Sequence, residues 1–247
     1  MAKAMKVIFN ADDFGLTKGV NKGIVRSHLQ GVVRSTTLLV GLPEEEHAVA
    51  LANKIPTLKV GIHLRFTLGA PLTRSTNLSD TNGTFYKYAE FWSHRGFSAQ
   101  AIYDECIAQV EAFLATGLTL SHIDSHHHAH THPEFLPVVT EVAAKYRVPL
   151  RGQSAPNLNY FFTDQFYDQG VDLMGLVNHL LELEKRYELV EVMCHPAIVD
   201  QALAHSSGYS EQRKKELNVL TDDKLATLLE RHSIEVTDYS ALSIQHS

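Results

Sequence analysis

The segment 122–133 of this chain holds seven side chains that can bind a metal ion: His122, Asp124, His126, His127, His128, His130 and His132. Neutral imidazole is the commonest metal ligand among side chains, and a carboxylate often orients a ligating ring. Such a segment indicates either a divalent-ion site or a histidine-rich loop in solvent. Asp12, Asp13 and His63, elsewhere in the chain, favour the first interpretation.

The candidate ligands and acid–base groups stand at the C-terminal ends of five predicted strands. These positions are Asp12 and Asp13 after 6–11, His63 in 58–64, His126 after 120–125, Arg151 in 148–151 and His195 after 189–194. Because the parallel strands of a β/α fold end at one shared rim, these distant side chains are predicted to converge there.

One histidine of the cluster is the favoured ligand. In an extended chain, His126 shares a face with Asp124 and His128, since alternate residues point the same way. In a helix, His126 pairs instead with His130, four residues further on. His126 is therefore the favoured metal ligand in either conformation. The other histidines are expected to line the pocket or to support the ligands.

Asp13, His63 and His126 make up a set of one carboxylate and two imidazoles that leaves positions open for water and substrate. A site of this type holds a divalent ion as a Lewis acid and lowers the pKa of its bound water. The identity of the ion stays open between Zn²⁺, which imidazole ligands favour, and Mg²⁺, which prefers oxygen ligands.

The other three rim residues are candidates for proton transfer and orientation. Asp12 is adjacent to a ligand but is not needed as one, so it is placed to accept the proton of the attacking water. Arg151 is predicted to pair with Asp12 and orient it, and His195 is predicted to protonate a leaving amine. Together with the metal, these groups indicate hydrolysis through a tetrahedral oxyanion.

Each of these residues also has a purely structural interpretation. An Asp-Asp pair after a strand is typical of a helix N-cap or a turn, and its two side chains converge only if the backbone is irregular. His63 and His195 could be hydrogen-bonded core histidines, and Arg151 could form a structural salt bridge. Their joint placement at strand ends favours the functional interpretation.

Strands that alternate with helices must position these side chains. Further strands are predicted at 33–40 and 234–238, and helices at 19–30, 43–54, 98–116, 133–146, 171–187 and 221–232, the last capped by Thr221. The segments predicted to be irregular are 69–96, 153–169 and most of 197–219, with a short helix at 211–216.

This order predicts one α/β domain over residues 1–247, with mostly parallel strands joined by right-handed crossovers. Seven strands without an obvious eighth unit indicate a distorted or incomplete (β/α) barrel, TIM-like in plan. An open doubly wound sheet is the alternative.

The composition limits the expected partners of the chain. Of its 247 residues 44% are apolar, and its net charge is −6 without a long basic run, so neither nucleic acid nor an anionic membrane is predicted as a partner. Cys106 and Cys194 lack the spacing of a metal or redox motif and are expected as free thiols. No apolar run suits a secretory signal or a membrane helix, so a cytoplasmic location is expected.

Four motifs in this order, NADDFG, GIHL, HIDSHHHAH and VMCHP, resemble those of the YdjC-like carbohydrate deacetylases, including chitooligosaccharide deacetylases. The resemblance implies a distorted β/α barrel, a divalent ion that is often magnesium in this family, and a homodimer. It also implies removal of N-acetyl groups from small acetylated amino sugars. The implied roles are metal ligands for Asp13, His63 and His126, general base for Asp12 and general acid for His195, with Arg151 a weaker match.

Two other functions are compatible with a histidine-rich rim. A metal-dependent phosphoesterase or amidohydrolase on a similar barrel commonly begins with a His-x-His pair, where this chain has Asp12-Asp13. A non-enzymatic metal-binding protein would bind several ions weakly and would not depend on Asp12.

Aromatic residues in two of the irregular segments could stack on sugar rings: Tyr86, Phe91, Trp92, Tyr160 and Phe161. Packing of these segments onto the barrel is the favoured interpretation for most of them.

Overall fold

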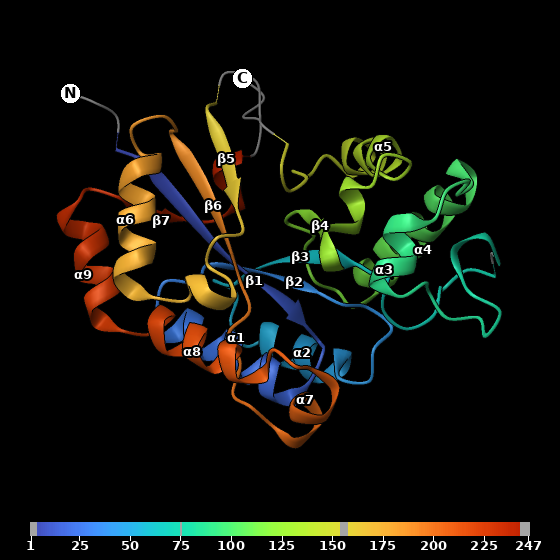
Figure 1. Cartoon of the computed structure of the whole chain (residues 1–247), viewed down its shortest axis with the longest axis horizontal. Coiled ribbons are helices and arrows are strands. Elements are labelled where there is room, and N and C mark those ends of the chain that lie inside the picture. The colour runs from blue at the N-terminus through green and yellow to red at the C-terminus, as the bar shows by residue number, and fades with distance from the viewer. Residues whose placement is uncertain (1–3, 75, 154–157, 243–247) are drawn as a thin grey trace.

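The structure is a computed structural model that describes residues 4–74, 76–153 and 158–242. Its centre is one sheet surrounded by helices (Figure 1). In the described residues the strands are β1 (Lys6–Phe14), β2 (Ser35–Leu38), β3 (Lys59–Leu64), β4 (Ile123–Ser125), β5 (Tyr160–Thr163), β6 (Leu189–Cys194) and β7 (Glu235–Thr237). The α-helices are α1 (Lys18–Leu29), α2 (Glu45–Ala52), α3 (Tyr88–Ser93), α4 (Ala99–Ala115), α5 (Leu136–Tyr146), α6 (Leu173–Leu183), α7 (Gln201–Ser206), α8 (Ser210–Leu220) and α9 (Asp223–Arg231).

The sheet is an incomplete barrel. Its strands follow the order β4-β3-β2-β1-β6-β5, and β7 also pairs with β1. The six strand pairings are all parallel. Among the described residues no pairing joins β4 to β5, so the barrel is open between them. The predicted class, an α/β incomplete barrel with mostly parallel strands, is confirmed.

The two central strands are buried along almost their whole length. All residues of β1 after Lys6 are buried, and so is every residue of β6. In a β/α barrel, helices cover the outer face of the parallel strands and side chains fill the inner face, which explains this burial. Polar side chains on these strands, such as Asn10 and Glu191, are therefore expected to have internal partners.

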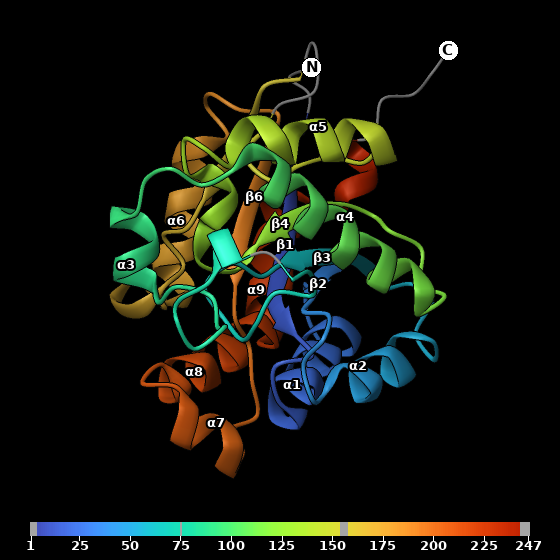
Figure 2. The ribbon, with the colours of Figure 1, turned by 90° about the vertical axis from the view of Figure 1, so that its right-hand side faces the viewer.

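The C-terminal end of β1 faces one group of helices. Figure 1 shows α4 and α5 to the right of the sheet, α6 and α9 to its left, and α1, α2, α7 and α8 below. The view turned by 90° again shows this lower group below the sheet, with the arrowhead of β1 pointing toward it (Figure 2). Residues that follow β1 are thus placed close to α8.

Most predicted elements are confirmed, with bounds that differ by a few residues. The strand predicted at 148–151 is wrong, because only an isolated bridge between Leu150 and Ile123 forms and Arg151 already lies in a turn. The segment predicted to be irregular at 153–169 contains β5, which pairs with β6, while residues 154–157 lie outside the described residues. A strand as short as β5 inside a long loop gives little periodic signal.

Two predictions near the C-terminus need correction. The segment 197–219 was expected to be mostly a loop with a short helix at 211–216; that helix is confirmed as part of α8, but the segment also contains α7. Asp222, not Thr221, caps α9, since its side chain accepts the Lys224 backbone N–H. The Thr221 hydroxyl instead donates to the Leu217 carbonyl at the end of α8.

Among the described residues, no helix combines the length and the apolar character needed to cross a lipid bilayer.

Candidate active site

The backbone at the end of β1 allows two adjacent carboxylates to face one site. Asp13 has a left-handed backbone, with φ of 71°, and the pairing of β1 with β2 shifts register between Ala11 and Phe14. In a regular strand, neighbouring side chains point to opposite faces. The irregular backbone required for both aspartates to contribute is therefore present.

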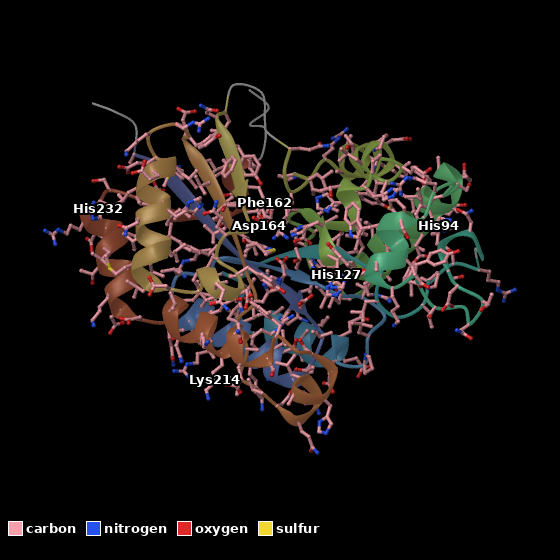
Figure 3. All side chains as sticks on the ribbon, viewed as in Figure 1. His94, His127, Phe162, Asp164, Lys214 and His232 are labelled. Atoms are coloured by element: carbon pink, nitrogen blue, oxygen red, sulfur yellow. The ribbon has the colours of Figure 1, made fainter. Side chains whose placement is uncertain are left out.

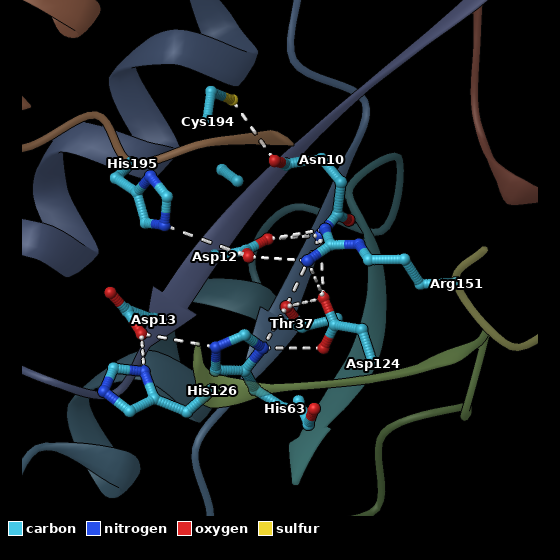
Figure 4. Close-up of polar contacts among 12 residues, drawn as sticks. Asn10, Asp12, Asp13, Thr37, His63, Asp124, His126, Arg151, Cys194 and His195 are labelled. Atoms are coloured by element: carbon cyan, nitrogen blue, oxygen red, sulfur yellow. Dashed lines mark hydrogen bonds and ion pairs between the residues drawn. The ribbon is translucent and has the colours of Figure 1, made fainter. Parts of the chain in front are cut away.

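Asp13, His63 and His126 bring three potential metal ligands to one point. Their ligand atoms lie within 4.8 Å of one another. Asp13 Oδ1 is 2.8 Å from His126 Nδ1 and 3.4 Å from His63 Nε2 (Figure 4). The three residues come from β1, from β3 and from the position directly after β4, as the shared rim predicts.

Asp124 fixes the orientation of one of these imidazoles. Its Oδ1 atom lies 2.6 Å from His63 Nδ1, and Thr37 donates a hydrogen bond of 3.0 Å to its Oδ2 atom. Burial lowers the pKa of His63, but Asp124 and the neighbouring carboxylates outweigh it and raise the pKa to about 10. A carboxylate on the far nitrogen is the usual support of a ligating histidine, and it leaves Nε2 directed toward Asp13.

Arg151 holds Asp12 by two hydrogen bonds. Its Nη1 and Nη2 atoms donate to the two carboxylate oxygens, each at 2.7 Å, and Asn10 Nδ2 donates to Oδ1 at 2.9 Å. Arg151 also contacts Asp124 at 2.9 Å and Glu191 at 2.6 Å. Burial would raise the pKa of Asp12, but the guanidinium outweighs it and holds the pKa well below its usual range. Asp12 is thus an ionised carboxylate held in a fixed orientation.

His195 follows β6 and lies beside Asp12. Its Nε2 atom is 3.9 Å from Asp12 Oδ2, and its Nδ1 atom is 3.9 Å from Glu216 Oε1. Its backbone N–H donates to Glu216, which also accepts a hydrogen bond of 2.7 Å from Tyr209. Burial, together with the charge of Arg213, lowers the pKa of His195 to about 3. The free protein therefore holds this imidazole neutral.

The sequence reasoning gave no role of their own to four residues that contact the predicted ones. Arg213 Nη2 donates to Asp13 Oδ2, and Glu216 contacts His195. Both stand on α8, within the short helix predicted at 211–216, and nothing in that segment indicated that it reaches the site. Asp124 was recognised only as part of the cluster, and Glu191 gave no signal because a charged residue inside an apolar strand has no motif around it.

Most histidines of the cluster bind protein groups. His126 is the one member that the described residues place in a group of possible ligands. The backbone turns sharply after it, with left-handed φ values of 56° and 55° at the next two positions. The partners are Asn10 and Tyr239 for His122, Thr67 for His127, Phe162 for His128, Ser125 for His130 and Phe91 for His132. Figure 3 shows His127 near the centre of the molecule, with His94 and His232 at its periphery.

The five aromatic residues considered for sugar stacking have partners within the protein. Phe91 is buried among other rings, Tyr160 donates a hydrogen bond to Glu191, and Phe161 stacks on Tyr187. Tyr86 stacks on His94, and Trp92 packs against Phe91. These contacts agree with the favoured interpretation that most of them pack the irregular segments onto the barrel.

Solved structures of a family 4 carbohydrate esterase and of a peptidoglycan deacetylase share this fold. One, from Streptomyces lividans in complex with acetate, has a TM-score of 0.52 at 10% identity and covers 95% of this chain and 92% of its own. Another is the catalytic domain of a peptidoglycan N-acetylglucosamine deacetylase from Eubacterium rectale ATCC 33656. It has a TM-score of 0.54 at 13% identity and covers 97% and 92% of the two chains. At these identities the likeness defines the fold class alone.

The chain belongs to the YdjC-like family, whose profile, described as YdjC-like protein, matches residues 6–231. A carbohydrate deacetylase from Vibrio cholerae serotype O1 (strain M66-2) is 60% identical over 243 residues, 96% of each chain. One from Brevibacillus brevis (strain 47 / JCM 6285 / NBRC 100599) is 40% identical over 252 residues, 96% of this chain and all of its own. These relatives confirm the predicted enzyme class, carbohydrate deacetylase.

A solved structure also supports the fold over the whole chain. It is from Enterococcus faecalis V583 and is named a cellobiose-phosphate cleavage protein. It is 31% identical, has a TM-score of 0.89, and covers 98% of this chain and all of its own.

Proposed function

We propose that the protein is a metal-dependent hydrolase that removes N-acetyl groups from small acetylated amino sugars such as chitooligosaccharides. The observation that carries this proposal is the convergence of Asp13, His63 and His126 beside an Asp12 carboxylate oriented by Arg151. A single domain over residues 1–247, a homodimer and a cytoplasmic location remain predictions.

The donor set fits a divalent ion. Two imidazoles and one carboxylate suit Zn²⁺, while Mg²⁺ remains compatible with the carboxylate and with water ligands. Asp124 supports the His63 ring on the nitrogen that faces away from Asp13, as a ligand needs. When bound, the ion supplies Lewis acidity at the acetyl carbonyl and lowers the pKa of the attacking water.

Two side chains of the rim move protons in the proposed reaction. Asp12 accepts the proton of the attacking water, and Arg151 keeps this carboxylate ionised and in position. His195 delivers a proton to the amine that leaves. Its Nε2 atom lies 3.9 Å from Asp12 Oδ2, so His195 is placed to pass on the proton that Asp12 takes from the water.

The substitution Asp12→Asn tests this proposal. We expect turnover to fall by about 10²–10⁴-fold, because the amide cannot accept the proton of water, while bound metal stays at one ion per chain. The measurements are acetate release from diacetylchitobiose and metal content after dialysis. Asp104→Asn, on an exposed position of α4, is the matched control and should keep wild-type turnover.

Full activity of Asp12→Asn with the metal retained would contradict the proposed mechanism. Several weakly bound ions per chain, and no acetate release from the wild type, would instead favour a metal-binding protein without catalysis.

A further inference from the structure

We infer that Tyr167 is the surface on which the sugar ring of the substrate stacks. The residue lies between β5 and α6 and is 45% exposed, so part of its ring is open to a ligand. This inference rests on the proposed deacetylase function and names the position of the sugar within that site.

The chemistry of the amide decides on which side of the site the sugar must lie. In an N-acetyl amino sugar, the carbonyl oxygen belongs to the acetyl group and the nitrogen belongs to the sugar. A divalent ion held by Asp13, His63 and His126 would polarise the oxygen, and His195 is the proposed proton donor to the nitrogen. The sugar ring is therefore bound on the His195 side, so an aromatic surface beside His195 would contact it.

Tyr167 is the exposed aromatic residue that contacts His195. The two rings meet edge to face, with centroids 5.7 Å apart and planes inclined by 71°. One face of Tyr167 is covered by Tyr209, which lies parallel to it at 4.2 Å with an angle of 7°. The exposed surface of Tyr167 is therefore available to a ligand that also reaches His195.

The stack of Tyr167 on Tyr209 is anchored to the catalytic rim. The Tyr209 hydroxyl donates to Glu216 Oε1 at 2.7 Å and accepts the Asp168 backbone N–H at 2.7 Å. Gln212 Nε2 donates to Asp168 Oδ1 at 3.3 Å. Since Glu216 also accepts the backbone N–H of His195, the aromatic stack and the imidazole share one anchor. A ring held in this way loses little conformational freedom when a ligand binds.

The other large exposed aromatic residue of the described chain lies beside the proposed metal ligand His126. Tyr88, 55% exposed, contacts His127 at a centroid distance of 5.2 Å, next to the ligand His126. It therefore lies beside the groups assigned to the acetyl oxygen, whereas the ring contacts of His195 in the described residues are with Tyr167 and Tyr209. This placement makes Tyr88 a matched control of the same residue type and similar exposure.

The ligand class follows from the surface of the ring. The face of a tyrosine is the negative side of its quadrupole and attracts the polarised C–H groups of a pyranose. Sugars of the glucosamine series carry equatorial hydroxyls and so present axial C–H groups on a ring face. We therefore assign to Tyr167 the pyranose whose acetamido group is hydrolysed.

Steady-state kinetics with diacetylchitobiose test this assignment. In Tyr167→Ala we expect KM to rise about five- to tenfold with kcat changed by less than about twofold, because the stacking acts in the substrate complex and the transition state alike. Tyr167→Phe should keep wild-type KM, since the ring face is retained. Tyr88→Ala should change KM by less than about twofold.

Calorimetric binding of the deacetylated glucosamine disaccharide gives a readout that does not depend on turnover. Its affinity should fall in Tyr167→Ala by the same factor as KM rises. If the alanine variant does not fold, as judged by its circular dichroism, Tyr167→Leu replaces it in both measurements.

Three results would overturn the assignment: unchanged KM and product affinity in a folded, active Tyr167→Ala, a loss confined to kcat, or a larger effect of Tyr88→Ala. A loss confined to kcat would mean that Tyr167 only supports His195. Absence of acetate release by the wild type would contradict the proposed function itself and is seen before any variant is made.

Discussion

The left-handed backbone of Asp13 gives two neighbouring carboxylates different environments. Asp12 is bound by Arg151, while Asp13 contacts His126 and Arg213. A left-handed conformation of a non-glycine residue costs about 1–2 kcal/mol and persists where surrounding contacts hold it. Here it separates a proposed proton acceptor from a proposed metal ligand within two consecutive residues.

Glu216 should make the stability of the protein depend on pH. Burial raises its pKa from 4.5 to about 8, so between these values the folded protein binds a proton that the unfolded chain does not. The stabilisation from this proton is lost as the pH rises through the folded pKa. We expect the free energy of unfolding of the wild type to fall relative to Glu216→Gln between pH 5 and pH 8, by up to about 1.4 kcal/mol per pH unit.

Urea unfolding of the two proteins at several pH values measures this difference. The comparison isolates Glu216, because the other titrating groups are common to both proteins. A difference that stays constant over this range would show that the carboxyl is ionised in the folded protein.

At the element scale, α8 carries several groups of the site although its sequence lacks an apolar stripe. Its buried residues are Arg213, Glu216, Leu217 and Leu220, which lie on one face at helical spacing. Two of these four are charged, so the hydrophobic periodicity that predicts a helix is weak. The partners of these charges come from β1 and from the end of β6, which no local pattern can indicate.

At the junction of α8 and α9, substitutions can test which residue caps α9. Asp222→Ala should lower the free energy of unfolding by about 1 kcal/mol, because the carboxylate caps the first turn of α9. Thr221→Ala should cost less, since its hydroxyl contacts only the Leu217 carbonyl at the end of α8. Urea denaturation of both variants makes the comparison. A larger loss of unfolding free energy in Thr221→Ala would mean that Thr221, the cap predicted from the sequence, caps α9 after all.

At the scale of the whole molecule, the proposed metal connects three parts of the barrel. Its ligands come from β1, from β3 and from the residue after β4. We expect a chelator to lower the melting temperature and to abolish activity, because an ion that binds only the folded state stabilises it. That stabilisation is about 2.7 kcal/mol when the ion is present at 100 times its dissociation constant.

Thermal unfolding with and without added Zn²⁺ measures this effect. His126→Ala removes a half-buried ligand and should abolish the response to the ion. An equal response in this variant would place the ion at another site.

The sequence by itself determined the alternation of strands and helices, the incomplete barrel and the rim at which Asp12, Asp13, His63, His126 and His195 meet. It could do so because hydrophobic periodicity is local and because parallel strands end on one side of the sheet. The pairing of Arg151 with Asp12 was also predicted, although Arg151 makes it from a turn and not from a strand. Only the tertiary structure decided that Arg213 reaches Asp13 across 200 positions and that Glu216 binds the backbone N–H of His195. These buried charges find their partners through packing of distant segments, which leaves no trace in the spacing of either one.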